Sequence, residues 1–166
     1  MAIVIDATEG GASANSYVTL AQAETYFEAR LDIDSWSGAT VTDDTKNRAL
    51  VTAAKRIDSN DLSGSRTSDT QALKFPRDGL GSYDGIDFTD GTTPQQVKDA
   101  QCEIAYELLA DIDNGGIESF GAVKIGNVQF EDNQEEKLDS SGSSWQILLS
   151  IFMSLGSSNQ VEIFRA

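Results

Sequence analysis

The fold is decided by residues 93–111, which read TPQQVKDAQCEIAYELLAD. Thr93 can cap a helix with its hydroxyl, Pro94 suits the first helical position, and Gln96 completes a Thr-x-x-Gln capping box. Apolar residues then recur at helical spacing and charged residues take the other side. The apolar stripe consists of Val97, Ala100, Ile104, Leu108 and Leu109. Since one face of this helix must be buried, the sequence predicts other helices that cover it.

A first helix begins at Thr19, which forms a second Thr-x-x-Gln capping box with Gln22. Its apolar stripe is formed by Leu20, Ala23, Phe27 and Leu31. A connector over residues 32–42 follows and contains Trp36, whose large ring with a single polar atom suits the edge of a core better than a ligand site.

A second helix is predicted from about Asp43 to Asn60. Asp43 begins it and Lys55 lies near its end, which is the order of charges that the helix dipole favours. The face that should be buried is flat and made of small residues, which permits close helix packing. That face comprises Ala49, Leu50, Ala53, Ala54 and Ile57.

Residues 61–92 form a long connection between the second helix and the helix at 93–111. A loop of this length in a compact domain is usually functional or mobile. Within it, Pro76 disfavours helical angles at Phe75, and Gly79 allows a turn. Its acidic residues do not follow the spacing of a calcium-binding loop, so an acidic turn is the preferred interpretation.

The chain after the helix at 93–111 changes character twice. Residues 123–130 alternate about Gly126-Asn127 and predict a small β-hairpin. Residues 131–144 are acidic and serine-rich, which is typical of a flexible linker. Residues 145–155 predict an apolar helix, and Val161–Phe164 predict a strand-like tail. The apolar helix can pack on its own body or on another subunit, and the sequence leaves both open.

These elements predict a mainly α fold: a small helical bundle with a long inter-helix loop, a small β-hairpin, and a C-terminal helix with a strand-like tail. We expect a helical body over residues 1–116, a hairpin and acidic linker over 117–144, and a C-terminal helix and docking tail over 145–166. The chain of 166 residues is long enough to bury a core without disulfides.

Charge is distributed unevenly along the chain. The net charge is -15, which argues against a surface that coats nucleic acid. The segment from Lys46 to Arg77, however, contains seven of the 12 basic residues and only three acidic residues, which gives it a net charge of +4. The rest of the chain therefore carries a net charge of -19. Unlike faces of this kind can pair head to tail between copies and close a ring, although a chance fluctuation on a solvated face explains the pattern equally well.

Residues for catalysis are scarce. The sequence has no histidine and a single cysteine, Cys102, which excludes Ser-His and Cys-His machinery and the usual zinc ligand sets. No phosphate-binding loop or dinucleotide fingerprint is present. We therefore expect no enzyme activity, no catalytic residue, no cofactor and no metal. The N-terminus lacks the pattern of a secretion signal, and no apolar stretch is long enough to span a bilayer, so we expect synthesis in the cytoplasm without a membrane anchor.

Several motifs occur together in a fixed order: residues 15–30 (NSYVTLAQAETYFEAR), the helix at 49–58, QALKFPR at 71–77, the helix from Thr93 to Ala105, GAVK at 121–124 and VEIFR at 161–165. In this order they resemble the head-to-tail connector adaptors (head completion proteins) of tailed bacteriophages over nearly the whole chain. Many such proteins are labelled DnaT-like single-stranded-DNA-binding proteins. The acidic linker at 131–144 departs from the family pattern.

The resemblance implies a structural virion protein that forms an oligomeric ring, commonly of twelve copies, in the neck between capsid and tail. It would dock on the portal protein, extend the DNA channel, offer a platform to the next tail or neck component, and let genomic DNA pass during ejection without sequence-specific binding. Before assembly the chain would lie in the host cytoplasm.

Three sets of residues follow as candidates. Portal docking is assigned to Trp145, Ile147, Leu148, Ile151, Phe152, Val161, Ile163, Phe164 and Arg165. The tail-facing loop is assigned to Leu73, Phe75, Pro76, Arg77, Tyr83 and Phe88. Contacts between subunits are assigned to Arg48, Lys55 and Arg56.

The alternative is a single-stranded-DNA-binding accessory protein of replication. It would use the basic zone at 46–77, with Phe75 and Tyr83 as rings on which bases stack. The overall charge and the sparse aromatic residues argue against it.

Overall fold

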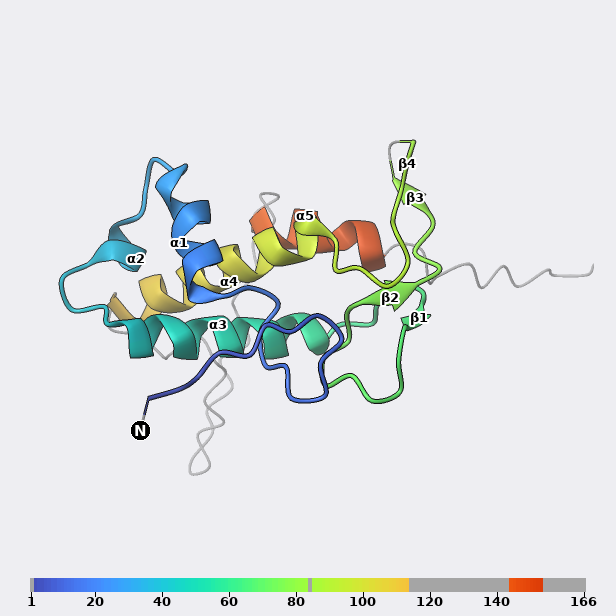
Figure 1. Ribbon diagram of the computed structural model, residues 1–166. Coiled ribbons are helices and arrows are strands. Elements are labelled where there is room, and N and C mark those ends of the chain that lie inside the picture. The colour runs from blue at the N-terminus through green and yellow to red at the C-terminus, as the bar shows by residue number, and fades with distance from the viewer. Residues whose placement is uncertain (1, 84, 114–143, 154–166) are drawn as a thin grey trace, which may run out of the picture.

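A computed structural model describes residues 2–83, 85–113 and 144–153 (Figure 1). The described elements, in chain order, are α1 (Leu20–Glu28), α2 (Asp34–Ser37), α3 (Asp43–Asp58), β1 (Ser65–Arg66), β2 (Arg77–Asp78), β3 (Ser82–Tyr83), β4 (Ile86–Asp87), α4 (Gln95–Asp113) and α5 (Ser144–Met153). The predicted mainly α fold is confirmed. The predicted hairpin at 123–130, the linker up to residue 143 and the tail at 161–165 lie outside the described residues.

Helix α4 is the centre of the bundle. It packs on α3 along one side and on α5 along another, and α1 and α2 also contact it (Figure 1). The predicted stripe is buried, with Val97, Ala100 and Ile104 fully inaccessible to solvent. The helix begins at Gln95, one residue later than a Thr93 cap predicts, and the Thr93 amide donates to the carboxylate of Glu9. A side chain from the N-terminal segment therefore lies at the positive end of α4, where a carboxylate is favoured.

The first helix confirms its predicted start and corrects its predicted length. Gln22 N donates to Thr19 Oγ1 at 3.2 Å and Thr19 N donates to Gln22 Oε1 at 2.8 Å, which is the complete capping box. The helix ends at Glu28, so Leu31 does not join the apolar stripe and is fully exposed. The expectation that Leu31 is a core residue is wrong, because the segment after Glu28 is held to α4 by its polar residues.

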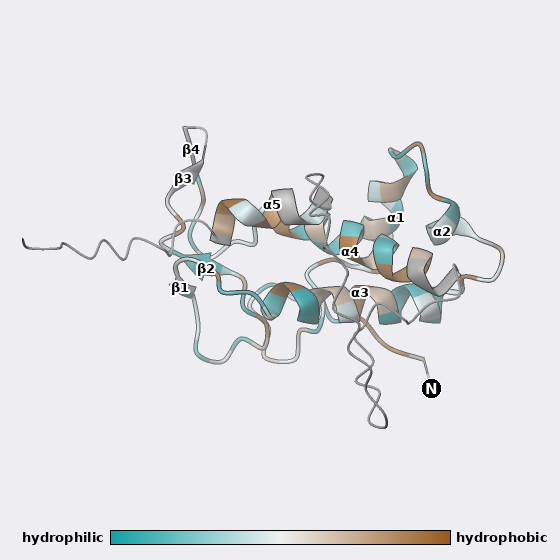
Figure 2. Ribbon diagram, turned by 180° about the vertical axis from the view of Figure 1, so that it is seen from behind, coloured by the Kyte–Doolittle hydropathy of each residue, from teal (hydrophilic) through white to brown (hydrophobic). Residues whose placement is uncertain are grey.

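Helix α3 has the predicted small-residue face. Ala53, Ala54 and Ile57 are completely buried, and this face packs on α4. Thr42 caps the helix, with Thr45 N donating to its Oγ1 at 3.3 Å. Hydrophilic and hydrophobic residues alternate along the helix in Figure 2, as an amphipathic surface helix requires.

The C-terminal helix packs on its own chain. Leu149 and Phe152 of α5 are completely buried, and Trp145 Nε1 donates to Glu107 Oε2 of α4 at 2.7 Å. The choice that the sequence left open is thereby resolved in favour of the body. Residues 144–153 complete the bundle.

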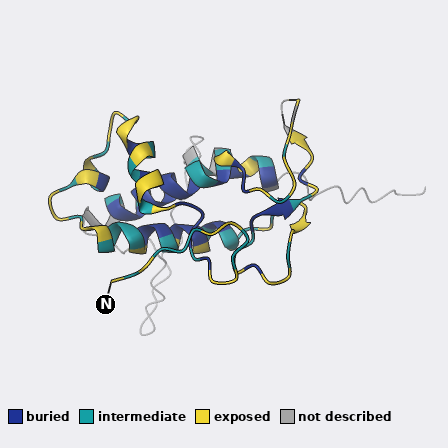
Figure 3. Cartoon of the chain, in the orientation of Figure 1, coloured by how far each residue is buried: buried dark blue, intermediate teal, exposed yellow. Residues whose placement is uncertain are grey.

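The connection at 61–92 is anchored and contains two short ladders that the sequence did not predict. Strands β1 and β2 pair antiparallel with Ser65 opposite Asp78, and β3 and β4 pair with Ser82 opposite Asp87. In Figure 3, β2 is buried whereas β1 is exposed. Gly64 has a φ of 74°, and a Cβ there would meet the Asp78 carbonyl, so the approach of β1 to β2 requires glycine at this position.

Aromatic rings link these layers. Trp36 is 1% exposed and stacks on Phe27 with ring centroids 4.3 Å apart, which confirms its place at the core. At the other end of the bundle, Phe152 lies edge-on to Phe75 at 5.5 Å and near Phe88 at 5.1 Å. The connection at 61–92 is therefore packed on the last turn of α5.

Candidate nucleic-acid interface

The basic zone at 46–77 is largely used inside the protein. Lys46 Nζ lies 2.6 Å from Glu24 Oε1 and 5.1 Å from the centre of the Trp36 ring. Lys74 Nζ donates to the Asn60 carbonyl at 2.7 Å. These two cations hold structure together and are poorly placed to meet a phosphate.

Arg77 makes the most hydrogen bonds within the protein among the described cations of the basic zone. Its side chain is buried, and its guanidinium donates to four carbonyl oxygens. Nε contacts Ser63 O at 2.5 Å, Nη2 contacts Leu62 O at 3.0 Å and Gly64 O at 2.7 Å, and Nη1 contacts Lys74 O at 3.3 Å. Burial lowers the pKa of this guanidinium from its usual value. The planar guanidinium of Arg77 holds the two ends of residues 62–74 together through these carbonyls. Its side chain is therefore directed into its own chain, whereas a residue of the tail-facing set would have to reach a partner.

Exposed cations remain on the outer side of α3. Arg48, Thr52 and Lys55 are all exposed, and their spacing of four and then three residues places them on one helical face. We call these three residues the α3 outer face. Arg48 and Lys55 are seven residues apart, which is about 10 Å along the axis. Arg48 Nε also lies 2.9 Å from Asp44 Oδ2, an exposed ion pair of little net energy that a phosphate can displace.

Arg56 points elsewhere. It is half-buried, and its guanidinium carbon lies 5.7 Å from the centre of the Trp145 ring. Arg56 therefore connects α3 to α5, whereas Arg48 and Lys55 of the same predicted inter-subunit set face solvent.

One of the two aromatic rings on which bases were expected to stack is buried. Phe75 is 2% exposed and lies edge-on to Tyr17 at 5.9 Å, so its face cannot accept a base. Tyr83 lies in β3, and its side chain is outside the described part of the chain. Stacking on Phe75 is therefore excluded as a means of recognition.

Tyr17 and Asp58 form a buried polar contact beneath the same segment. The Tyr17 hydroxyl donates to Asp58 Oδ1, Lys74 N donates to Asp58 Oδ2 at 3.1 Å, and Phe75 N donates to the Tyr17 hydroxyl at 3.3 Å. Burial raises the pKa of Asp58 above its usual 3.8 and, together with the Asp58 charge, raises that of Tyr17. Both groups serve to fix the backbone of residues 74–75 against α3.

The remaining predicted contact residues are buried or partly buried wherever the structure describes their side chains. Of the tail-facing set, Pro76 is buried, and Leu73 and Phe88 are partly buried against the core. Of the portal-docking set, Leu148 and Ile151 are partly buried against the same core, and the side chain of Ile147 is not described. Val161, Ile163, Phe164 and Arg165 lie outside the described residues.

The described ranges offer no candidate for a metal site or a membrane-spanning helix. Residues 2–83, 85–113 and 144–153 contain no group of three or more potential metal ligands. In that same part of the chain, no helix is both long and apolar enough to cross a membrane. Cys102 is buried, and burial raises the pKa of its thiol to about 12, so it is held as an unreactive thiol at neutral pH.

A comparison with protein families matches residues 1–166 to a family described as "Putative DnaT-like ssDNA binding protein". Searches of curated proteins and of solved structures gave no match. The family description names single-stranded DNA and mentions no portal, tail or ring, so it favours the alternative reading of the sequence over the connector adaptor.

Proposed function

Because the chain belongs over its whole length to the DnaT-like ssDNA-binding protein family, we propose that it binds single-stranded DNA through the α3 outer face. The observation that supports this site is the pair of exposed cations, Arg48 and Lys55, on one side of α3. The other described cations of the basic zone that bind the protein itself, Lys46, Lys74 and Arg77, are excluded as the main phosphate contacts.

The contact proposed is with phosphates and not with bases. Two cations about 10 Å apart along a helix can each meet a phosphate of a flexible single strand. Thr52 lies between them, and its hydroxyl donates to the Arg48 carbonyl at 2.8 Å. Without Phe75 as a stacking platform, the interaction draws little energy from base faces. Binding should therefore be weak and independent of sequence. It should be strongest at low salt, where the attraction to the two cations is least screened, although the acidic remainder of the protein also repels the strand most strongly there.

Fluorescence anisotropy of a labelled oligothymidine of about 20 nucleotides tests the site. Lys55→Glu reverses one of the two cations, and we expect it to weaken binding by about tenfold or more at low salt. Lys98→Glu is the matched control, since it makes the same charge change on the half-exposed surface of α4. Equal losses from the two substitutions would show only a response to net charge, and the site on α3 would be refuted.

A second function, the connector adaptor, is favoured by a different observation. Ser63 N and Ser63 Oγ donate to the Phe152 carbonyl at 2.9 and 2.6 Å, so the connection at 61–92 is bound to the end of α5. The connection at 61–92 and the end of α5, which belong to the two segments expected to meet the neighbours of an adaptor, thus lie together at one end of the bundle, away from α1 and α2 (Figure 1). In this proposal the protein is a structural component of a phage neck and not an enzyme.

Quantitative mass spectrometry of purified particles and of the soluble fraction from the same infected cells distinguishes the two functions. A copy number in particles equal to that of the portal protein would establish the adaptor and give the number of subunits in the ring. Detection only in the soluble fraction would reject a virion role and leave DNA binding as the function.

A further inference from the structure

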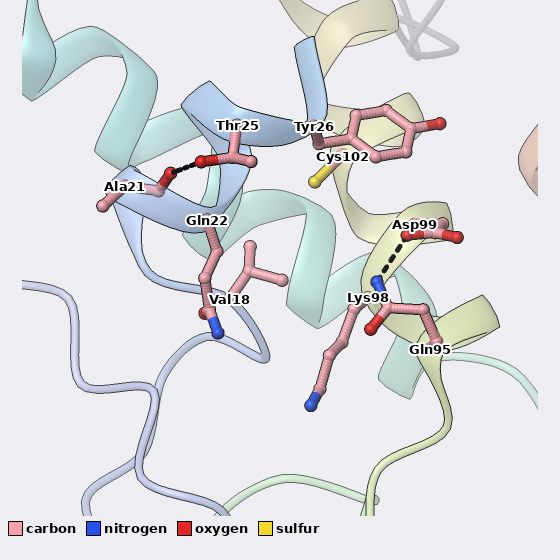
Figure 4. Close-up of a pocket in the computed structure, with 9 residues that line it drawn as sticks. All are labelled: Val18, Ala21, Gln22, Thr25, Tyr26, Gln95, Lys98, Asp99 and Cys102. Atoms are coloured by element: carbon pink, nitrogen blue, oxygen red, sulfur yellow. Dashed lines mark hydrogen bonds between the residues drawn. The ribbon is translucent and has the colours of Figure 1, made fainter. Parts of the chain in front are cut away.

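A groove runs along the outside of the bundle between α1 and α4. It has a volume of about 400 Å³, and its apolar lining includes Val18, Ala21, Tyr26 and Cys102. Figure 4 shows these residues, with the residues from α1 on one side of the hollow and those from α4 on the other. Several lining side chains are short, Val18, Ala21 and Cys102 among them, which leaves space between the two helices. The groove is large enough to take an apolar side chain from a partner.

Its rim on α4 carries one charge of each sign. Lys98 and Asp99 are adjacent and half-exposed at the edge of the groove. Gln95 Nε2 donates to Asp99 Oδ1 at 2.7 Å, which holds that carboxylate at the rim (Figure 4). A partner segment that complements this rim should present an apolar residue between a cation and an anion.

The chain itself offers such a segment at Arg30-Leu31-Asp32. Leu31 is fully exposed, and only Val4 among the other large apolar residues of the described chain is classed with it as exposed. The two residues that flank Leu31 are bound to α4, which keeps the Leu31 side chain from turning toward the core. Arg30 Nη1 lies 2.7 Å from Glu103 Oε2 with the guanidinium over the Tyr106 ring, and the Tyr106 hydroxyl donates to Asp32 Oδ1 at 2.9 Å. Both flanking residues are fastened to α4, so Leu31 is presented to solvent by a fixed turn.

We propose that Leu31 of one copy inserts into the α1–α4 groove of a second copy. The apolar residue and the groove lie at different places on the chain, so the contact is heterologous: each copy uses its groove on one neighbour and its Leu31 on the other. The charges flanking Leu31 are opposite to those of the rim, so Arg30 lies beside Asp99 and Asp32 beside Lys98 of the second copy while both keep their bonds to α4 of their own copy. The surface differs from the α3 outer face, and the inference does not depend on DNA binding.

Two variants that each remove one half of the contact give a direct test. Leu31→Gln removes the inserted side chain, and Thr25→Trp fills the groove from an exposed position on α1. Sedimentation velocity of the wild-type protein at concentrations up to about 1 mM should show association beyond a dimer. Each variant alone should weaken association by about tenfold or more.

An equimolar mixture of the two variants separates this contact from all others. Leu31→Gln still offers a groove and Thr25→Trp still offers Leu31, so the mixture should form a heterodimer and nothing larger. Val4→Gln is the control, because it removes the other exposed apolar side chain and should associate as the wild type does. Circular dichroism verifies that all variants are folded. A wild type that stays monomeric, variants that associate like it, or a mixture that gives no dimer would each overturn the proposal.

Discussion

Replacing Gln101 with methionine should lower the free energy of unfolding more than the small change in side-chain shape suggests. Gln101 is completely buried at the centre of α4 and joins three parts of the chain. Its Nε2 donates to Ser16 Oγ at 2.7 Å and to the Leu50 carbonyl at 2.8 Å, and its Oε1 accepts from Tyr17 N at 2.9 Å. Methionine has a similar shape but satisfies none of these groups.

The magnitude follows from the three hydrogen bonds. Each contributes about 1 kcal/mol net, and an amide left buried without a partner costs about 1–3 kcal/mol. The Tyr17 amide suffers that penalty most, because Gln101 is its hydrogen-bond partner. The other two groups keep a partner, since the Leu50 carbonyl lies within α3 and the Ser16 hydroxyl also donates to the Val18 carbonyl at 2.6 Å. We therefore expect Gln101→Met to lower the free energy of unfolding by about 3–4 kcal/mol, a large fraction of the stability of an ordinary domain.

Urea unfolding followed by tryptophan fluorescence measures this change, because Trp36 is buried in the core and Trp145 joins α5 to α4 through its bond to Glu107. Gln95→Met is the control in the same helix, since Gln95 is exposed and should tolerate the change within about 0.5 kcal/mol. A loss from Gln101→Met below about 1 kcal/mol would refute the reasoning, because it would mean that the buried amide does not hold the N-terminal segment to α3 and α4.

Two further substitutions test the anchoring of the connection at 61–92. Arg77→Met removes donors from four carbonyl groups and should cost about 3–5 kcal/mol in urea unfolding, whereas an effect no larger than that of an exposed site would contradict the enclosed guanidinium. Burial raises the pKa of Asp58 in the folded protein, so the native state holds that proton more tightly and the stability contributed by Asp58 falls as pH rises through its native pKa. Relative to wild type, Asp58→Asn should therefore gain stability as pH rises from the usual carboxyl pKa of 3.8 through the raised native pKa of Asp58, and a difference that stays constant with pH would show that Asp58 titrates normally.

The sequence was sufficient for the parts of the fold that depend on local chemistry. The capping box at Thr19, the charge order of α3 and the apolar stripe of α4 all act within one helix, and all three are present. Leu31 was misplaced for the opposite reason. Its spacing from Phe27 suits a helix, but the chain leaves that helix because Arg30 and Asp32 bond to Glu103 and Tyr106 in α4, more than seventy residues away.

Buried polar residues were the other source of error. Glu103 was assigned to the solvent side of α4, yet it is 8% exposed and accepts from the Tyr26 hydroxyl at 2.6 Å. Gln101 gave a usable signal, since it falls four residues after Val97 and three before Ile104, on the buried stripe. Arg77 gave none, because the four carbonyl groups that surround it are brought together only by the path of the connection.

The candidate site was predictable in part for the same reason. The sequence singled out Arg48 and Lys55, although as contacts between subunits, and helical spacing places the two on a common face. The sequence could not show that Lys46, Lys74 and Arg77 are bound within the protein, or that Phe75 lies in the core between Tyr17 and Phe152. Those facts reduce a basic zone of seven residues to three exposed cations, Arg48 and Lys55 on α3 and Arg66 in β1.

The salt dependence of oligothymidine binding tests the central claim most directly. Each phosphate neutralised on a single strand contributes about 0.7 to the slope of log K against log salt, so two cations on the α3 outer face predict a slope of about -1.4 for the wild type. Lys55→Glu should reduce that slope by about half, and Lys98→Glu should leave it unchanged. Absence of binding at the lowest salt concentration, or a slope that Lys55→Glu does not alter, would contradict single-stranded DNA binding by this face of α3.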